Sequence, residues 1–291
     1  MVMIMDNKDT KGTLYICATP IGNLEDITLR AKRILQEVDL IAAEDTRHTR
    51  KLLSFYDIHT PLTSYHEHNK WEKGPKLISE TCTGKNIALV SDAGTPGISD
   101  PGQDLVSLAV DAGVTVVTIP GASAVVSALV ISGLPTDRFC FEGFLPRAKK
   151  DRNTVIQQWA QEQRTIVFYE SPYRLQKTLE ELSPLFGERN VAVTRELTKT
   201  HEQVVRGKLT TVLEHFRENS PKGEIAVIMQ GNSEIKEAPL RGPTDIFETV
   251  SNLVQQGHIK KDAIKEAARL LGVSKREVYD TILRAEKKKP E

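Results

Sequence analysis

Residues 91–102, SDAGTPGISDPG, carry the densest group of potential ligand-binding residues in this sequence. Glycine lets the backbone approach a ligand closely, proline restricts the shape of the loop, and Asp92 and Asp100 add two carboxylates. The apolar run at 86–90 predicts a buried strand before the loop, and an amphipathic helix follows it with Asp100 as the predicted N-cap. Such connections usually span about 2–6 residues, so this longer one favours a ligand-binding function over a simple link.

Three other loops also follow predicted strands, at residues 19–26, 44–47 and 120–124. Because ligands bind at the carboxyl ends of the strands in α/β sheets, the four loops together predict one crevice. None of them matches the GxGxxG dinucleotide fingerprint or the GxxxxGK[ST] phosphate loop. The loops offer carboxylates and few central cations, which favours a neutral or positive ligand over a polyphosphate.

Metal and serine-hydrolase chemistry find little support. His66 and His68 flank Glu67, but no third ligand stands in an accepted zinc spacing, so no metal site is predicted. Ser123 lies in GASA rather than in the nucleophile elbow GxSxG. The three cysteines are scattered without a CxxC pair, which indicates a reducing compartment.

Two basic clusters follow predicted strand ends. The first holds Arg47, Arg50 and Lys51, and the second holds Arg147, Lys149, Lys150 and Arg152. Each cluster is either a solvated face or a surface for the phosphates of a nucleic acid, and charge runs alone do not decide between the two.

The bulk composition sets the class of protein. The chain has 291 residues, 39% hydrophobic, and a formal net charge of zero, so any nucleic-acid binding must come from local patches. The N-terminus shows no signal peptide. Residues 114–136 carry no charged side chain, but Pro120-Gly121 breaks the run, so it is interpreted as a strand, a turn and a buried helix rather than a membrane span. We expect a cytoplasmic protein without a membrane segment.

The pattern of elements predicts two α/β domains. Strands at 13–19, 39–43, 86–90 and 114–119 alternate with helices in residues 12–135, which predicts a parallel sheet. Residues 136–232 predict a second α/β unit with neighbouring antiparallel strands, at 138–145, 165–169, 190–195, 201–207 and 224–230.

The remaining segments are assigned by composition and helical pattern. Residues 1–11 are predicted to be a disordered tail and 233–243 a linker. Residues 244–291 predict a basic, helix–turn–helix-like domain, in which Ser274 and Glu277 form a capping box.

Seven motifs occur in an order that resembles the tetrapyrrole-methylase superfamily. They are ATPIGNLEDIT (18–28), AAEDTRHTRKLL (42–53), SDAGTPGISDPG (91–102), PGASA (120–124), GFLPR (143–147), FYESPYRL (168–175) and GEIAVI (223–228). Within that superfamily the sequence is most similar to the branch that methylates small-subunit ribosomal RNA. The resemblance implies two α/β domains with S-adenosyl-L-methionine in the cleft between them, usually in a homodimer, and 2′-O-methylation of a cytidine ribose in the decoding region of 16S rRNA.

The resemblance also implies site residues, carried over motif by motif. The positions expected to border the cofactor are Pro20, Ile21, Asp92, Gly94, Thr95, Ile98, Ser123, Ala124, Tyr169, Leu197, Ile225 and Ala226. Because a ribose hydroxyl is a poor nucleophile, a carboxylate base is expected to help, with Asp100, Glu170 and Asp45 as candidates. Arg47, Arg50, Lys51, Arg147, Lys149 and Lys150 are the candidate contacts to RNA phosphates.

Two other readings stay open at this stage. One is a methylase of a tetrapyrrole, another small molecule or a protein on the same fold; the first and central loops, ATPIGN and SDAGTP, depart from those of tetrapyrrole-modifying members. The other is a non-catalytic RNA-binding factor, which cofactor binding would distinguish from either methylase.

Overall fold

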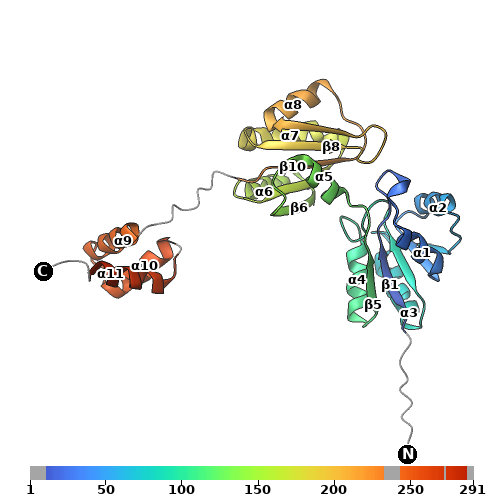
Figure 1. The fold of residues 1–291 in the computed structure, drawn as a ribbon, viewed down its shortest axis with the longest axis horizontal. Helices are drawn as coiled ribbons and strands as arrows, with labels where there is room; N and C mark the ends of the chain where they lie inside the picture. Colours follow the sequence, from blue (N-terminus) through green and yellow to red (C-terminus); the bar gives the residue numbers. More distant parts are fainter. Residues whose placement is uncertain (1–10, 233–242, 272, 287–291) are drawn as a thin grey trace, which may run out of the picture. The chain divides into compact units, whose positions relative to one another are not determined.

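The structure is a computed structural model that describes residues 11–232, 243–271 and 273–286. The predicted tail at 1–11 and the predicted linker at 233–243 lie outside the described residues, except for the last residue of each. The chain divides into two compact units, residues 1–232 and 233–291. The first unit contains two five-stranded sheets, which confirms the predicted pair of α/β domains (Figure 1).

The first sheet is entirely parallel and runs in the order β3-β2-β4-β1-β5. Its strands are β1 (Thr13–Cys17), β2 (Leu40–Ala43), β3 (Leu62–Ser64), β4 (Ile87–Val90) and β5 (Thr115–Ile119). Strand β3 was not predicted, because three residues at a sheet edge are too few to show a two-residue hydrophobic period.

Helices cover both faces of this sheet. The short helix η1 (Leu24–Asp26) precedes α1 (Leu29–Glu37), which packs with α2 (Thr46–Phe55) on one face. Helices α3 (Lys70–Cys82) and α4 (Gly102–Asp111) cover the other. Every residue of β4 is buried, as expected of a central strand covered on both sides.

The start of α4 differs from the sequence prediction. The N-cap is Pro101 rather than Asp100. The Asp100 carboxylate instead closes the preceding loop, because its Oδ1 accepts hydrogen bonds from the N–H groups of Gly97 at 2.8 Å and Gly102 at 2.7 Å. The Gly102 N–H at the helix start is thereby satisfied by a side chain just upstream of the cap.

The second sheet is mixed and runs in the order β6-β7-β10-β8-β9. Its strands are β6 (Phe139–Phe144), β7 (Thr165–Glu170), β8 (Asn190–Arg195), β9 (Gln203–Lys208) and β10 (Ile225–Met229). The β6–β7 pair is parallel and the other pairs are antiparallel, which confirms the predicted antiparallel neighbours.

The helices of this sheet come from both sides of the predicted boundary at residue 135. One face is covered by α6 (Lys149–Trp159), α7 (Pro172–Phe186) and α8 (Leu209–Glu218). The other face is covered by α5 (Ala124–Ser132), which follows β5 in the chain yet packs against β7, β8 and β10. The helix after the first sheet therefore belongs, by its packing, to the second.

The C-terminal unit is helical in its described residues, with α9 (Pro243–Gln255), α10 (Lys260–Leu271) and α11 (Lys275–Glu286). Its core contains the predicted apolar residues Ala267 and Ala268 of α10, and Ser274 Oγ accepts the N–H of Glu277 at 3.1 Å. Across the residues that the structure describes, no helix combines the length and apolar character required to span a bilayer.

The capping hydrogen bond makes a measurable prediction. Replacing Ser274→Ala removes the acceptor for an N-terminal N–H of α11 and should cost about 1 kcal/mol of local stability. Amide hydrogen exchange of α11 in the full chain measures this, with Ser251→Ala inside α9 as the control. Equal protection of α11 in both variants would contradict the prediction.

Candidate functional site

Two loops of the first domain are joined by a reciprocal backbone bridge. The N–H of Thr19 donates to the carbonyl of Gly94 at 2.9 Å, and the N–H of Gly94 donates back to the carbonyl of Thr19 at 3.0 Å. Gly94 has φ +79°, and an added Cβ would lie 3.3 Å from Ile21 Cγ2. A glycine is therefore required where the loop after β1 meets the loop after β4.

Side-chain hydrogen bonds bring in the other two loops. Thr95 Oγ1 donates to the carbonyl of Ala122 at 3.2 Å, which ties in the loop after β5. Asp92 Oδ1 accepts the N–H of Asp45 at 3.0 Å, and the Asp92 N–H donates to Glu44 Oε2 at 3.4 Å. The four loops predicted to share one crevice thus meet at one edge of the sheet.

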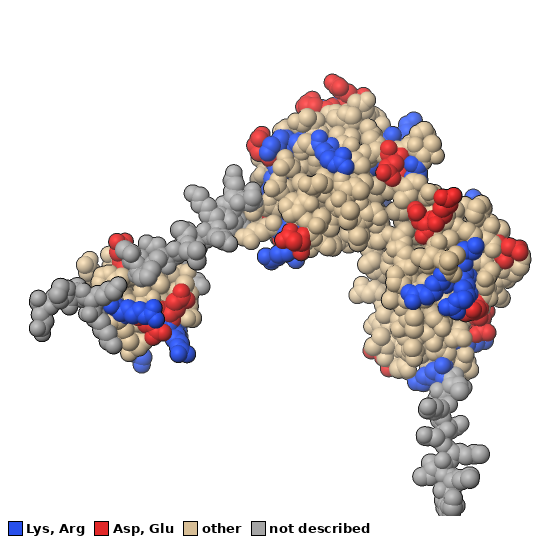
Figure 2. Space-filling view, in the orientation of Figure 1, with Lys and Arg blue, Asp and Glu red and all other residues tan. Residues whose placement is uncertain are grey.

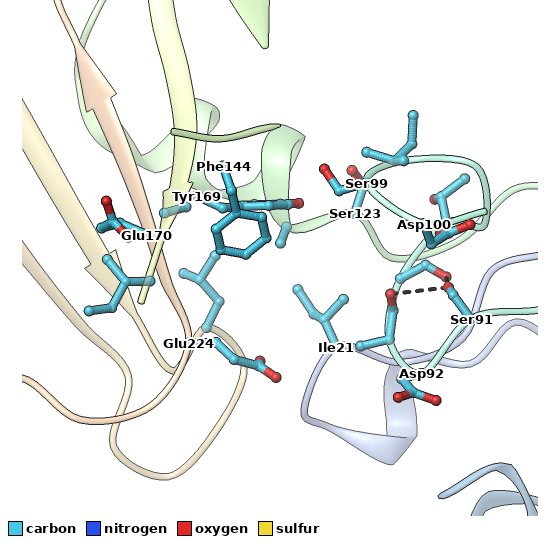
Figure 3. Close-up of a pocket in the computed structure, with 18 of the residues that line it drawn as sticks. Ile21, Ser91, Asp92, Ser99, Asp100, Ser123, Phe144, Tyr169, Glu170 and Glu224 are labelled. Atoms are coloured by element: carbon cyan, nitrogen blue, oxygen red, sulfur yellow. Dashed lines mark hydrogen bonds between the residues drawn. The ribbon is translucent and has the colours of Figure 1, made fainter. Parts of the chain in front are cut away.

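A cavity of about 430 Å³ lies between these loops and the second domain. Figure 3 shows Ile21, Ser123 and Asp92 of the first domain facing Phe144, Tyr169 and Glu224 of the second. The lining residues are Ile21, Glu44, Ser91, Asp92, Ala93, Gly94, Thr95, Ile98, Ser99, Asp100, Ser123, Ala124, Phe144, Tyr169, Glu170, Ser171, Pro172, Leu197, Gly223, Glu224, Ile225 and Ala226. The volume is in the range of small-molecule sites, about 300–1,000 Å³.

The charge of this cavity is one-sided. Its lining includes the carboxyl groups of Glu44, Asp92, Asp100, Glu170 and Glu224. Among the described residues that line it, none is lysine, arginine or histidine. The cavity can therefore hold a cationic ligand favourably, and it offers no counter-charge to a phosphate.

An aromatic wall closes the cavity on the side of the second domain. The centroid of the Tyr169 ring lies 5.0 Å from the centroid of the Phe141 ring and 5.5 Å from that of the Phe144 ring. Burial, followed by the charge of Glu224, raises the pKa of Tyr169 to about 12. Tyr169 is therefore a neutral phenol at physiological pH, and its ring offers a flat apolar face to a ligand.

The structure brings the predicted cofactor positions together. Of the positions carried over from the motifs, all line this cavity except Pro20, which lines an adjoining one. Glu44, Phe144 and Glu224 also line the cavity and were not predicted. The position of Glu44 directly after β2 could have indicated it as a site residue, whereas the sequence analysis named its neighbour Asp45 as a candidate base.

The three predicted base candidates differ in what their oxygens already bind. Asp100 lines the cavity, and its Oδ1 holds the loop while no hydrogen bond to Oδ2 occurs within the described part of the chain. Glu170 also lines the cavity, but its fully buried side chain accepts from the Ser171 N–H at 2.8 Å and the Thr178 hydroxyl at 2.7 Å. Its oxygens are therefore committed to holding the strand end in place.

Asp45 is the weakest of the three candidates. It does not line the cavity, and it forms the N-cap of α2 by accepting the N–H of Arg47. The hydrogen bonds from the Arg47 guanidinium, at 2.7 Å for the closest pair, hold the pKa of Asp45 well below its usual range. A carboxylate with so low a pKa is a poor acceptor for a proton.

Glu44 has the opposite electrostatic environment. Burial raises its pKa above the ordinary glutamate value, and the charges of Asp92 and Asp100 raise it further. The backbone hydrogen bond from Asp92 and the charge of His66 partly offset this rise. A carboxyl group in a cavity with a raised pKa is a candidate for proton transfer.

The predicted RNA-contact residues lie on two exposed surfaces of the first unit. Arg47, Arg50 and Lys51 are exposed on α2, and Arg147, Lys149 and Lys150 are exposed where β6 leads into α6. Figure 2 shows basic side chains gathered on the first domain in the region of α1, with acidic side chains beside them. Apart from Arg152, both predicted clusters consist of exposed cations on a chain without net charge.

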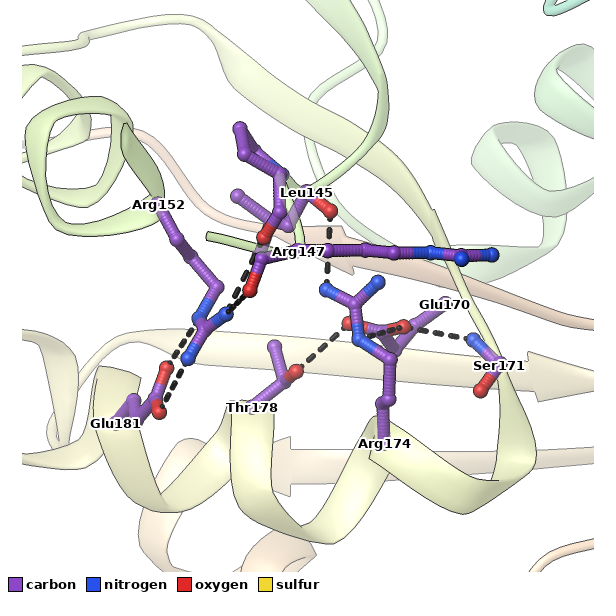
Figure 4. Close-up of polar contacts among 9 residues, drawn as sticks. Leu145, Arg147, Arg152, Glu170, Ser171, Arg174, Thr178 and Glu181 are labelled. Carbon is purple, nitrogen blue, oxygen red and sulfur yellow. Dashed lines mark hydrogen bonds and ion pairs between the residues drawn. The ribbon is translucent and has the colours of Figure 1, made fainter. Parts of the chain in front are cut away.

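Arg152 was predicted to belong to the second exposed basic cluster, and this prediction is wrong because its side chain is buried and not available to a ligand. Its guanidinium binds Glu181 at 2.6 and 2.8 Å and donates to the carbonyls of Pro146 and Arg147 (Figure 4). Arg174 likewise donates to the carbonyl of Leu145 at 2.9 Å and pairs with Glu170 at 3.3 Å. Two arginines thus fix the backbone of the loop from which the exposed Arg147 side chain projects.

Comparison with known proteins agrees with this geometry. Residues 13–213 match the family model Tetrapyrrole (Corrin/Porphyrin) Methylases. Two curated relatives are called Ribosomal RNA small subunit methyltransferase I. The one from Halalkalibacterium halodurans is 49% identical over 94% of this chain and 95% of that protein. The one from Synechocystis is 48% identical over 94% of this chain and 99% of that protein. This chain belongs to that family of tetrapyrrole methylases.

Solved structures show the same fold at lower identity. The uroporphyrin-III C-methyltransferase of Thermus thermophilus, crystallised with S-adenosylhomocysteine, matches with a TM-score of 0.53 and 21% identity, over 75% of this chain and 97% of that one. The fold that this chain shares with that structure covers 75% of its length.

The raised pKa of Glu44 predicts a pH-dependent stability. A carboxyl whose pKa is higher in the folded state stabilises the fold below the unfolded pKa, about 4.3, and that contribution is lost as the pH rises through the folded value. Replacing Glu44→Gln should therefore raise the melting temperature at about pH 8 more than at about pH 4. Thermal unfolding at both pH values measures this, with the exposed Glu218→Gln as control. An equal change in melting temperature at the two pH values would contradict this prediction.

The Arg152 network predicts a large effect on stability. Replacing Arg152→Ala leaves the Glu181 carboxylate and two backbone carbonyls without their partner, which should cost roughly 3–5 kcal/mol. Replacing Arg33→Ala breaks the exposed pair with Glu37 and should cost at most about 1 kcal/mol. Urea unfolding compares the two variants, and equal losses would show that the Arg152 network is not an anchor.

Proposed function

We propose that this protein transfers a methyl group from S-adenosyl-L-methionine to the 2′-hydroxyl of a cytidine ribose in the decoding region of 16S rRNA in the small ribosomal subunit. The observation that carries the cofactor assignment is the carboxylate-lined cavity, which has no basic residue among its described lining. The relatives' names support ribosomal RNA as the substrate. The reaction belongs in the cytoplasm, where ribosomal subunits are assembled in bacteria.

The cavity fits the cofactor by size and by chemistry. S-adenosyl-L-methionine has a flat adenosine and a cationic sulfonium, which match the Tyr169 wall and the carboxylates of Glu44 and Asp92. Leu197, Ile225 and Ala226 would contact the adenosine, and the Gly94–Thr95 backbone would border the methionine part. When bound, the cofactor supplies an electrophilic methyl group, and the protein supplies alignment and electrostatics.

The protein's own task is to orient a weak nucleophile and to accept its proton. The 2′-oxygen must point into the cavity, and the proton that it loses passes to a carboxylate or to water. Asp100 and Glu44 are the proposed acceptors, since each has an oxygen that binds no other described group. Glu170 is proposed instead to position Ser171 and Arg174.

The RNA would be held outside the cofactor cavity. Arg47, Arg50, Lys51, Arg147, Lys149 and Lys150 are the proposed phosphate contacts, because their exposed cations flank the cavity-forming loops. The basic C-terminal helical domain is proposed to add affinity for RNA, and the active form is proposed to be a homodimer.

Methyl transfer from labelled S-adenosyl-L-methionine tests the function. Small subunits from cells that lack the enzyme, naked 16S rRNA and a tetrapyrrole precursor are offered in parallel. We expect label in the rRNA at a linkage that resists alkali, because a 2′-O-methyl group blocks attack by the neighbouring hydroxyl. Label only in the tetrapyrrole, or label in RNA that alkali still cleaves at that linkage, would overturn the proposal.

Amide replacement tests the proposed proton acceptors. Replacing Glu44→Gln or Asp100→Asn removes a base, and the variant that lacks the true acceptor should lose about 10²-fold or more in turnover while it retains cofactor affinity. Isothermal titration with the cofactor and the pH profile of turnover are measured on both, with Glu218→Gln as control. Full turnover in both variants would exclude these two carboxylates as the base.

A further inference from the structure

A second cavity adjoins the cofactor cavity. It has a volume of about 520 Å³ and is lined from α2, from the loop after β1, and from Lys199 and Glu224 of the second domain. Its lining shares Ile21, Asp92, Ala93 and Glu224 with the first cavity. Figure 3 shows the Asp92 and Glu224 carboxylates on either side of Ile21, so these residues form a common wall.

One face of α2 forms the floor of this second cavity. His48, Lys51, Leu52 and Phe55 all line it, and their spacing is i, i+3, i+4 and i+7 along the helix. Residues at this spacing project from the same side of a helix. Leu52 is buried beneath the face, whereas His48, Lys51 and Phe55 are exposed, so this side of α2 presents two basic groups and an aromatic ring to the cavity.

Phe55 is a large aromatic side chain that is exposed to solvent. It is 64% exposed, and its ring packs edge-on against Tyr56 with the centroids 4.9 Å apart. Tyr56 is itself fixed, because its hydroxyl donates to the carbonyl of Leu24 and the Lys32 ammonium lies 4.8 Å from its ring centroid. Phe55 is therefore an exposed aromatic ring supported from behind, which is the form of a stacking platform for an unpaired base.

The charges of the two cavities differ. The second cavity includes His48, Lys51 and Lys199, whereas the described lining of the first has no basic residue. Lys199 is paired with Glu196 at 2.9 Å and with Glu224 at 3.0 Å, so the lining cation left to bind a ligand is Lys51 of α2, with the His48 imidazole beside it as a hydrogen-bonding group. A ligand with a flat base, a ribose and a phosphate matches this distribution, with the phosphate at Lys51 and His48.

We propose that the second cavity receives the target nucleotide of an RNA strand, with its base stacked on Phe55 and its phosphate at Lys51. The ribose then lies at the common wall of Asp92 and Glu224, where its hydroxyl faces the cofactor cavity. A nucleotide held this way is unstacked from its neighbours, as in other enzymes that act on a single nucleotide. This inference rests on the proposed function, since it assigns the substrate site of that reaction.

The test compares variants on two RNAs. The RNAs are a hairpin of the 16S decoding region and the same hairpin with an abasic ribose at the methylated position. Replacing Phe55→Ala should weaken binding of the intact hairpin roughly ten-fold, the loss typical of one stacked base, and Phe55→Trp should restore it. Trp71→Ala is the matched control, because Trp71 is 77% exposed and lines neither cavity. On the abasic hairpin, wild type and Phe55→Ala should bind equally.

Cofactor titration and methyl transfer separate the outcomes. Phe55→Ala should keep the wild-type affinity for S-adenosyl-L-methionine and raise KM for RNA, and Lys51→Ala should weaken both hairpins alike. If wild type methylates RNA but Phe55→Ala matches Trp71→Ala on the intact hairpin, or loses affinity equally on both hairpins, this inference is wrong and the proposed function stands. If wild type methylates no RNA, both fall.

Discussion

The reciprocal hydrogen bonds between Thr19 and Gly94 are the constraint on which the rest of the site depends. They join the loop after β1 to the loop after β4, two segments that are far apart in the sequence. Each bond contributes only about 0.5–1.5 kcal/mol, but together they fix how the loops sit against each other. The left-handed conformation of Gly94 permits the contact, and the neighbouring Thr95 extends it to the loop after β5. The backbone groups are satisfied among themselves, so the side chains of Ile21 and Asp92 are left to form the cavity wall.

Helix α5 couples this loop assembly to the second domain. Its first residue, Ala124, and the preceding Ser123 line the first cavity. Val125, Ala128 and Leu129 are buried against the face of the second sheet, in a cluster that also holds Ile21 of the first domain. The same helix is therefore tied to the first sheet by the chain and to the second by packing. Apolar burial at this joint packs α5 and Ile21 against the second sheet, beside the cavity that Tyr169 lines.

The separation of charge between the two cavities follows from which elements line them. The first cavity is built from strand-end loops, which supply carboxylates, and the adjoining cavity also uses the exposed side of α2, which supplies Lys51. The acidic lining of the first cavity disfavours a phosphate, whereas Lys51 gives the adjoining cavity a cation that attracts one. Asp92 and Glu224 stand at the wall that both share, where our proposals place the reacting atoms together.

The sequence by itself determined the fold class, and the resemblance of its motifs to a known family predicted most of the residues that line the first cavity. Buried strands, amphipathic helices and the long loops after the strands are local patterns, and loops at the carboxyl ends of parallel strands must meet at one edge. The tertiary structure decided what each charged side chain does. Glu170 is occupied by Ser171 and Thr178, Arg152 is buried against Glu181, and Glu44 rather than Asp45 faces the cavity. Hydrogen-bond partners of this kind come from other turns and other strands, so no local pattern encodes whether a carboxylate is free to react.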